Sequence, residues 1–389
     1  MSTHKPVSIC YYVSCHGFGH STRSAQIITK LIEMCHGEVV VNIIAHGKEF
    51  LFEEMLHSYP SASWVYRHSV IDPVVEQPLP YDVDRLTTLT NLECFMERYE
   101  EKIEEEVNWL TSVEAKLIVS DAPFLPCAAA QKCNVPSIIA SNFTFDKVYE
   151  GLLNGDSYDK IILKWLPIIT DAYKQANILL RMPGYIEIPA FLDNEPERII
   201  DTPLFGRKSR LSKVEVLKHL GIIKTDQEVM PKILLVAFGG HNMKEEKWNR
   251  ALPSGWVGIV CGFNSKEHKL PSNFLCVDRN TYVPDLVNCS DVVLGKLGFG
   301  TCTECILHKK PMLFVSRPAF IEEPGLLSMM QQYGLGIEIP RDDFEQGNWQ
   351  EFILKANEST YPEAKATSLD GDIFIATKLL THVSENRIL

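Results

Sequence analysis

The sequence lacks the features that would place the protein in a membrane or on a nucleic acid. No run of about eighteen apolar residues occurs, so no transmembrane helix is expected. The first residues show no signal-peptide pattern, because the strand expected at residues 7–15 is soon followed by glycine and histidine. The formal net charge of −12 argues against a nucleic acid or an anionic membrane as partner, since both require a basic face.

Paired cysteines are also lacking. The 11 cysteines are scattered and odd in number, which is typical of free thiols in a reducing compartment, so we expect a cytoplasmic protein. Cys302 and Cys305 form a single CxxC, without the second pair that a zinc site requires. We interpret both as structural thiols.

The length of 389 residues exceeds what one compact core holds and predicts two domains. Short apolar strands alternate with helical patterns in both halves, which predicts an α/β fold with two doubly wound, Rossmann-like parallel sheets. We place the first domain at residues 1–200 and the second at 201–371. A final helix at about 372–389 can pack back on the first domain.

Three segments carry narrower expectations. Residues 183–230, rich in Pro, Arg and Lys, are expected to connect the domains and to contain one helix near 211–219. Residues 89–110 predict one long helix whose glutamates, Glu106 among them, face solvent. Residues 311–315 are expected to be the last buried strand.

Polar residues follow the strands of the first half. The first strand ends in a glycine turn, HGFGH, in which Gly17 and Gly19 allow a tight bend. This turn differs from the dinucleotide-binding fingerprint, because the third glycine is absent and no acidic residue ends the second strand. Asp121 follows the strand at 116–120, which places a carboxylate in the ligand crevice of such a sheet.

The stretch DVVLGKLGFGTCTE, from Asp291 to Glu304, has the strongest ligand-binding pattern in the second half. Its apolar strand runs into a turn with Gly298 and Gly300, and Thr301 then stands at an expected helix N-terminus, which favours a diphosphate. Glu304 lies one turn further, where a carboxylate can accept hydrogen bonds from two ribose hydroxyls. An ordinary strand-to-helix connection is the alternative.

Together these features resemble the GT-B glycosyltransferases, among them the bacterial enzyme that adds N-acetylglucosamine to the peptidoglycan lipid intermediate. The chain is also similar to the N-terminal glycosyltransferase-like region of plant L-arabinokinase. The motifs that carry the resemblance span nearly the whole chain: YYVSCHGFGHSTR, SNFTFD, LPSGWVGIVCG, YVPDLVNCSDVVLGKLGFGTCTE and AFIEEPGLL. No sugar-kinase domain follows them, so kinase activity is not expected.

The resemblance implies a cleft between the domains, with a nucleotide sugar bound on the second domain. The Gly298–Glu304 turn is then expected to hold the uridine diphosphate and ribose. Lys296 either pairs with a phosphate or faces solvent. The other residues that the resemblance assigns to the donor are Gly239, Gly240 and His241 near the phosphates, and Glu322 and Glu323 near the sugar hydroxyls. No metal or cofactor is expected, in agreement with the absence of a DxD-like carboxylate pair; the UDP-sugar is a co-substrate.

On the first domain, the resemblance assigns the role of base to His20, because an inverting transferase needs a group to take the acceptor's proton. Asp121 is the candidate partner of this imidazole, or else a structural cap. His16 is the alternative base. Gly17 and Gly19 belong to the same acceptor-side turn, and Arg23 either reaches a phosphate or lies on the helix surface. Cys15 departs from the transferase pattern, which usually has glycine there.

Two hypotheses follow. The first is a metal-independent, inverting glycosyltransferase that moves a sugar from a UDP-sugar to an acceptor hydroxyl. The second is a non-catalytic nucleotide-sugar-binding or scaffold protein, since the similar region of L-arabinokinase is attached to a kinase. A nucleotide-sugar epimerase is a third, less favoured option. The sequence carries no motif for the acceptor, the donor sugar or the oligomeric state.

Overall fold

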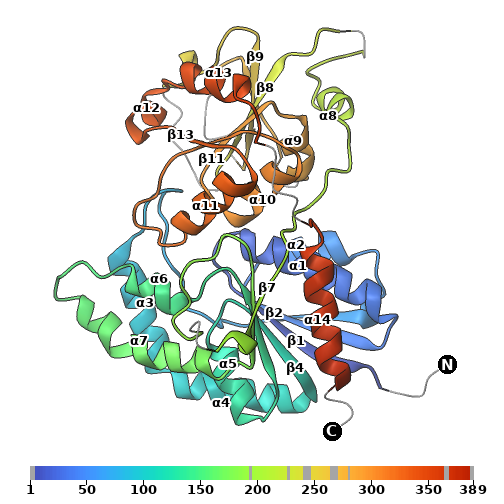
Figure 1. Ribbon diagram of the computed structural model, residues 1–389, viewed down its shortest axis with the longest axis vertical. Helices are drawn as coiled ribbons and strands as arrows, with labels where there is room; N and C mark the ends of the chain where they lie inside the picture. The colour runs from blue at the N-terminus through green and yellow to red at the C-terminus, as the bar shows by residue number, and fades with distance from the viewer. Residues whose placement is uncertain are drawn as a thin grey trace.

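The computed structural model describes residues 5–191, 195–225, 228–239, 247–262, 270–278, 281–362 and 368–385. These residues form two α/β units, each built on its own parallel sheet, and Figure 1 shows the second unit above the first. The predicted α/β class is confirmed. Of the helices in the described ranges, none combines the length and the apolar character that crossing a lipid bilayer requires.

The first sheet has seven parallel strands in the order β3-β2-β1-β4-β5-β6-β7. Its strands are β1 (Val7–Val13), β2 (Val39–Ala45), β3 (Trp64–His68), β4 (Ala115–Asp121), β5 (Ser137–Ser141), β6 (Ile178–Arg181) and β7 (Ile199–Asp201). The central strands read as continuous apolar runs such as VSICYYV, because helices cover both faces of the sheet. The strand order reverses between β1 and β4, and such a reversal opens a crevice at the carboxyl ends of the strands.

The helices of this unit are α1 (Gly19–Cys35), α2 (Glu49–Leu56), α3 (Arg85–Glu97), α4 (Tyr99–Ser112), α5 (Leu125–Lys132), α6 (Phe145–Glu150) and α7 (Asp159–Lys174), with 3₁₀ turns η1 (Ser61–Ser63) and η2 (Pro196–Arg198). The single helix expected at 89–110 is wrong. The chain breaks at Arg98 because α3 packs on α7 whereas α4 packs on α5.

The expectation for Glu106 is also wrong. Its side chain is buried, with 2% exposed, instead of facing solvent. It accepts a hydrogen bond of 2.7 Å from the Tyr12 hydroxyl and pairs with Arg67 at 2.7 Å. A buried carboxylate is tolerated here because both partners satisfy it.

The second sheet has six parallel strands in the order β10-β9-β8-β11-β12-β13. They are β8 (Lys232–Ala237), β9 (Trp256–Cys261), β10 (Phe274–Cys276), β11 (Val292–Gly295), β12 (Met312–Phe314) and β13 (Gly336–Glu338). The expectation that residues 311–315 hold the last buried strand is confirmed: all three residues of β12 are buried, and only the edge strand β13 follows it. This edge strand has only three residues, GIE, none of them buried, so it lacks an apolar run.

The helices after the first sheet are α8 (Lys213–His219), α9 (Val283–Cys289), α10 (Phe299–Leu307), α11 (Glu323–Tyr333), α12 (Arg341–Gln346), α13 (Gln350–Glu358) and α14 (Gly371–Glu385), with the 3₁₀ turn η3 (Trp248–Arg250). Helix α14 returns to the first unit and lies beside α1 (Figure 1). Gln26 of α1 donates a hydrogen bond of 3.0 Å to Asp372. Strand β7, at the edge of the first sheet, lies within the segment expected to connect the domains.

The two units meet closely beside the carboxyl ends of their strands. Tyr81, in the loop before α3, is 5% exposed and belongs to the apolar core of the second unit, with its ring 6.2 Å from that of Phe344. The next residue, Asp82, pairs with Arg341 of α12 at 2.8 Å. At a second contact, a Cβ on Gly325 would lie 2.5 Å from the carbonyl oxygen of Gly184, so the two backbones touch.

This contact yields a stability prediction. Tyr81→Ala removes a buried ring from the core of the second unit, and we expect it to lower the free energy of unfolding by about 3 kcal/mol. Asp82→Asn breaks only a half-exposed ion pair, and we expect it to cost about 1 kcal/mol or less. Urea unfolding of both variants measures the difference. If Asp82→Asn lowers the free energy of unfolding as much as Tyr81→Ala does, the ion pair and not the buried ring holds the units together, which contradicts this account.

Candidate functional site

A cavity of about 490 Å³ lies where the carboxyl ends of both sheets face each other. Its walls come from the glycine turn after β1, the turn after β11, and Arg207 in the segment that joins the units. It brings together most of the residues that the sequence singles out: His16, Gly17, Gly19, His20, Arg23, Gly239, Lys296, Gly298, Gly300, Thr301, Glu304 and Glu322. Asp121 and Glu323 do not line it, and Gly240 and His241 lie outside the described residues.

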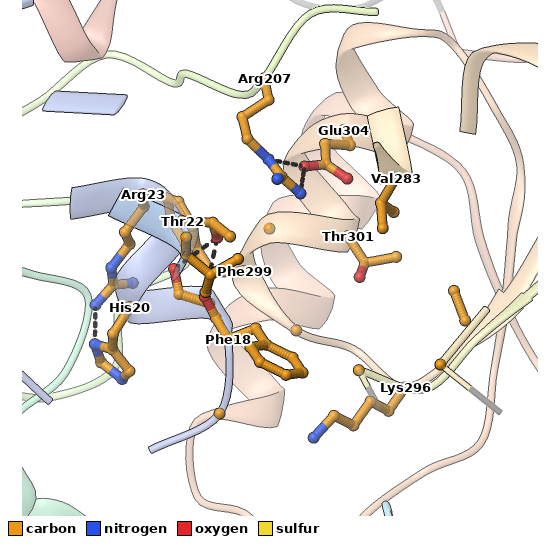
Figure 2. Close-up of a pocket in the computed structure, with 18 of the residues that line it drawn as sticks. Phe18, His20, Thr22, Arg23, Arg207, Val283, Lys296, Phe299, Thr301 and Glu304 are labelled. Atoms are coloured by element: carbon orange, nitrogen blue, oxygen red, sulfur yellow. Dashed lines mark hydrogen bonds and ion pairs between the residues drawn. The ribbon is translucent and has the colours of Figure 1, made fainter. Parts of the chain in front are cut away.

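His20 and Asp121 meet at the point where the strand order of the first sheet reverses. Asp121 ends β4, His20 lies in the first turn of α1, and the two side chains are 0% and 5% exposed. The distance from Nδ1 of His20 to a carboxylate oxygen of Asp121 is 2.8 Å. NH2 of Arg23 also lies 3.0 Å from Nδ1 (Figure 2). Because the ionised carboxylate of Asp121 can only accept, we assign the proton to Nδ1. The other ring nitrogen, Nε2, is therefore the one that can take a proton.

Arg23 completes a buried charge cluster with Asp121. Its Nε donates to the carboxylate at 2.8 Å, as does the Ser24 hydroxyl at 2.8 Å, and its NH1 donates to the Asn142 side chain at 2.6 Å. Burial alone would raise the pKa of Asp121, but the Arg23 guanidinium and His20 hold it well below its usual range. Of the two alternatives for Arg23, the helix surface is wrong, because this guanidinium is buried and compensates a buried carboxylate; contact with a phosphate stays a prediction.

His16 lies beside His20, with the ring centroids 6.5 Å apart. The side-chain amide of Gln77 lies 2.8 Å from Nε2 of His16, so this nitrogen accepts a hydrogen bond. Burial, His20 and the positive charge of Lys296 lower the pKa of His16 well below its usual value. A neutral imidazole whose Nε2 already accepts a bond is less suited to take a proton than His20.

The first turn of α10 lines the cavity with Phe299, Gly300 and Thr301. Gly298 is the N-cap, and the first helical hydrogen bond runs from the Cys302 N–H to the Gly298 carbonyl. The N–H groups of Phe299, Gly300 and Thr301 therefore have no acceptor within the helix. With the helix dipole, they form a site that favours an anion. Figure 2 shows Thr301 on this wall, facing Val283.

Lys296 directly follows β11, and its side chain extends along the cavity (Figure 2). A Cβ on Gly239 would lie 3.6 Å from Cε of Lys296, so the turns after β8 and β11 are adjacent. Gly239 has φ +69°, which explains the glycine at this position. Burial, and next the charge of Arg317, lower the pKa of Lys296 to about 7.

Glu304, the second buried acid of the site, is 2% exposed and pairs with Arg207. Nε and NH2 of Arg207 lie 2.8 and 2.7 Å from the same oxygen, Oε1 (Figure 2). Burial raises the pKa of Glu304, and the Arg207 guanidinium partly offsets this. Within the described residues, Oε2 makes no hydrogen bond.

Glu322 and Glu323 point in different directions. Glu323 accepts hydrogen bonds from the Ser316 hydroxyl at 2.7 Å and from the backbone N–H of Arg317 at 2.9 Å, so its carboxylate fastens the loop before α11. Glu322 lines the cavity, 3.3 Å from NH2 of Arg317. Of the two residues expected near the donor sugar, only Glu322 faces the cavity.

Tyr282 and Val283, at the start of α9, form the wall near Glu304. The Tyr282 hydroxyl donates to the Lys208 carbonyl at 3.1 Å, and the Arg210 guanidinium lies 3.7 Å from the centre of its ring. Among the described residues, no three His, Cys, Asp or Glu side chains are placed to share a metal ion.

We compared the sequence and the structure with those of known proteins. No family model matches the sequence. The chain is 34% identical over 357 residues to L-arabinokinase of Arabidopsis thaliana, a match that covers 90% of this chain and 32% of that protein. The chain thus spans about a third of the length of the curated relative.

Solved structures of glycosyltransferases match almost the whole chain. A UDP-glucosyltransferase from Polygonum tinctorium superposes with a TM-score of 0.61 at 15% identity, covering 99% of this chain and 100% of that one. The calicheamicin glycosyltransferase CalG4 gives 0.60 at 13%, covering 98% and 96%. UGT89C1 of Arabidopsis thaliana, solved with UDP-L-rhamnose, gives 0.55 at 13%, covering 98% and 96%. The chain has the GT-B fold. This confirms the predicted fold, and identities this low show nothing further.

Two residues of the GT-B cleft escaped sequence reasoning. Arg207 lies in a connecting segment, and no local pattern signals that this segment crosses α10. Tyr282 begins the YVPDL motif, which contributes to the resemblance. The motif draws attention to this position, but it does not indicate that the ring lines the cavity.

The low pKa of Lys296 predicts how stability changes with pH. Below about pH 7 Lys296 is charged in both the folded and the unfolded chain, and the folded state bears the full cost of burying that charge. Between about 7 and 10.5 only the unfolded chain holds this proton, so its contribution to the unfolding free energy rises with pH.

Lys296→Met should therefore stabilise the protein most below pH 7, and the gain should fade toward pH 10.5. Urea unfolding of the wild type and of Lys296→Met at several pH values measures this gain in stability. Lys5→Met is the control, because Lys5 is an exposed lysine. A gain that does not change with pH would contradict the low pKa.

Proposed function

We propose that the protein is a glycosyltransferase that moves a sugar from a UDP-sugar to an acceptor hydroxyl, with inversion at the anomeric carbon and without a metal ion. One observation carries this proposal: a single cavity has His20, which is bonded to the buried Asp121, on one wall and the N-terminus of α10 with Glu304 on the other. The first wall offers a base, and the second offers partners for a diphosphate and a ribose.

The donor lies along the second unit. Its diphosphate accepts hydrogen bonds from the first turn of α10 and pairs with Lys296. Its ribose hydroxyls donate to Oε2 of Glu304, and its base lies against Tyr282 and Val283. Gly240 and His241, which lie outside the described residues, stay predicted partners of the phosphates. A uridine nucleotide is favoured because UGT89C1 was solved with UDP and with UDP-L-rhamnose.

The reaction needs one proton transfer and one displacement. The acceptor hydroxyl gives its proton to Nε2 of His20, and its oxygen bonds to the anomeric carbon from the face opposite the diphosphate. The bond from that carbon to the diphosphate oxygen breaks, and UDP leaves with the electron pair. Asp121 stabilises the imidazolium that forms. The N–H groups of α10 and the charge of Lys296 offset the charge that develops on the leaving group, the role a metal would otherwise fill.

The protein is proposed to act in a reducing compartment such as the cytoplasm. All 11 cysteines are free thiols in the structure, including Cys302 and Cys305. A non-catalytic nucleotide-sugar-binding or scaffold protein is the second candidate. The match to about a third of L-arabinokinase favours it, because that relative is named as a kinase.

The donor site is tested by melting curves with UDP-, GDP- and dTDP-sugars. A UDP-sugar at about a hundred times its dissociation constant should add roughly 2.7 kcal/mol to the unfolding free energy. Glu304→Ala should abolish this gain, because the ribose loses its acceptor. If no nucleotide sugar shifts the melting temperature, the donor site is wrong and the scaffold hypothesis stands.

The base is tested separately, by UDP release from the best donor in the presence of pooled acceptors. His20→Ala should lower the rate roughly a hundredfold or more, since general base catalysis is worth about that much. Stabilisation by the donor should be kept, because His20 lies on the opposite wall. His16→Ala tests the alternative base. If His16→Ala loses more rate than His20→Ala, His16 and not His20 is the base.

A further inference from the structure

The segment that joins the two units is bonded to the donor wall along its length. Residues 206–211 lie between α1, α9 and α10. Their hydrogen bonds run from Gln26 to the Gly206 carbonyl (3.1 Å), from Tyr282 to the Lys208 carbonyl (3.1 Å), from the Ser209 N–H to His308 (3.1 Å), and from the N–H groups of Arg210 and Leu211 to Asp285 (2.5 and 3.0 Å). The backbone of this segment is therefore fixed against the donor site.

Arg207 is the residue of this segment that reaches into the cavity. The segment crosses α10 closely, since a Cβ on Gly206 would lie 3.2 Å from backbone atoms of Thr303, the residue before Glu304. The Arg207 side chain is 15% exposed, and both of its contacts with Glu304 go to Oε1. One carboxylate oxygen is thereby held by protein, while the other is left on the side of the cavity.

We propose that Arg207 is a positioning residue for the donor ribose: it fixes the Glu304 carboxylate so that Oε2 accepts the hydrogen bonds of the ribose hydroxyls. This inference rests on the function proposed above and extends it to a residue outside the glycine turn. Because Arg207 belongs to the segment between the units, the ribose site depends on the path of that segment as well as on α10.

The physical reason is the burial of Glu304. Removing the guanidinium leaves a buried carboxylate without a cation, and burial raises its pKa. A protonated acid has a donor where the ribose needs an acceptor. The freed side chain also gains rotamers in which Oε2 points away from the ribose.

The test compares UDP with 2′-deoxy-UDP by calorimetric titration. The ratio of the two affinities reports the bond from the 2′-hydroxyl to Glu304, because contacts with the base and the diphosphate are common to both ligands. The wild type should prefer UDP about tenfold or more, as expected for a hydrogen bond to a charged group. Arg207→Gln should bring this preference close to one, as should Glu304→Gln.

Arg210→Gln is the matched control. This substitution removes the same charge from the same segment. The Arg210 side chain stacks on Tyr282 but makes no bond to Glu304. It should keep the wild-type preference for UDP. The double variant Arg207→Gln/Glu304→Gln should resemble Glu304→Gln, because Arg207 acts only through the carboxylate.

The outcomes separate this inference from the proposed function. A wild type that binds UDP without preference, or does not bind it, overturns both. A wild type that prefers UDP, with an Arg207→Gln variant that keeps the same ratio at weaker affinity, overturns the positioning role alone. If Arg207→Gln does not fold, Arg207→Met takes its place: it also removes the cation beside Glu304, so the ratio should fall, and an unchanged ratio contradicts the role.

Discussion

The buried charge of Asp121 is the constraint on which the rest of the site depends. A carboxylate that is 0% exposed persists only if cations and hydrogen bonds compensate it, and Arg23, His20 and Ser24 do so. These contacts fasten α1 to the end of β4 and set the orientation of the His20 ring. Arg23 also lies 4.9 Å from the ring centre of Phe299 in α10, so the cluster extends to the second unit.

Both units present the carboxyl ends of their strands to the same cavity. In each sheet the strand order reverses beside its first strand, between β1 and β4 and between β8 and β11. The turns at these two points supply His20 on one side and Lys296 on the other. A nucleotide sugar that lies across the cavity, as proposed above, would touch both side chains.

Sequence reasoning reached the features that local chemistry determines. Apolar runs predicted the central strands, and the resemblance to the GT-B glycosyltransferases assigned His20 as base, with Asp121 as its candidate partner or else a structural cap; the two side chains are in contact. Residues whose role depends on the path of distant segments were missed: Arg207 acts because its segment crosses α10, and Glu106 is buried because Arg67 and Tyr12 reach it. Glu322 and Glu323 are identical in type, and only the turn before α11 decides which of them faces the cavity.

The most direct test of the central claim is a crystal structure with UDP and with the donor that stabilises the protein most. The account predicts the diphosphate at the first turn of α10, the ribose hydroxyls on Oε2 of Glu304, and the sugar directed toward Nε2 of His20. A nucleotide bound outside this cavity, or one whose sugar points away from His20, would contradict it.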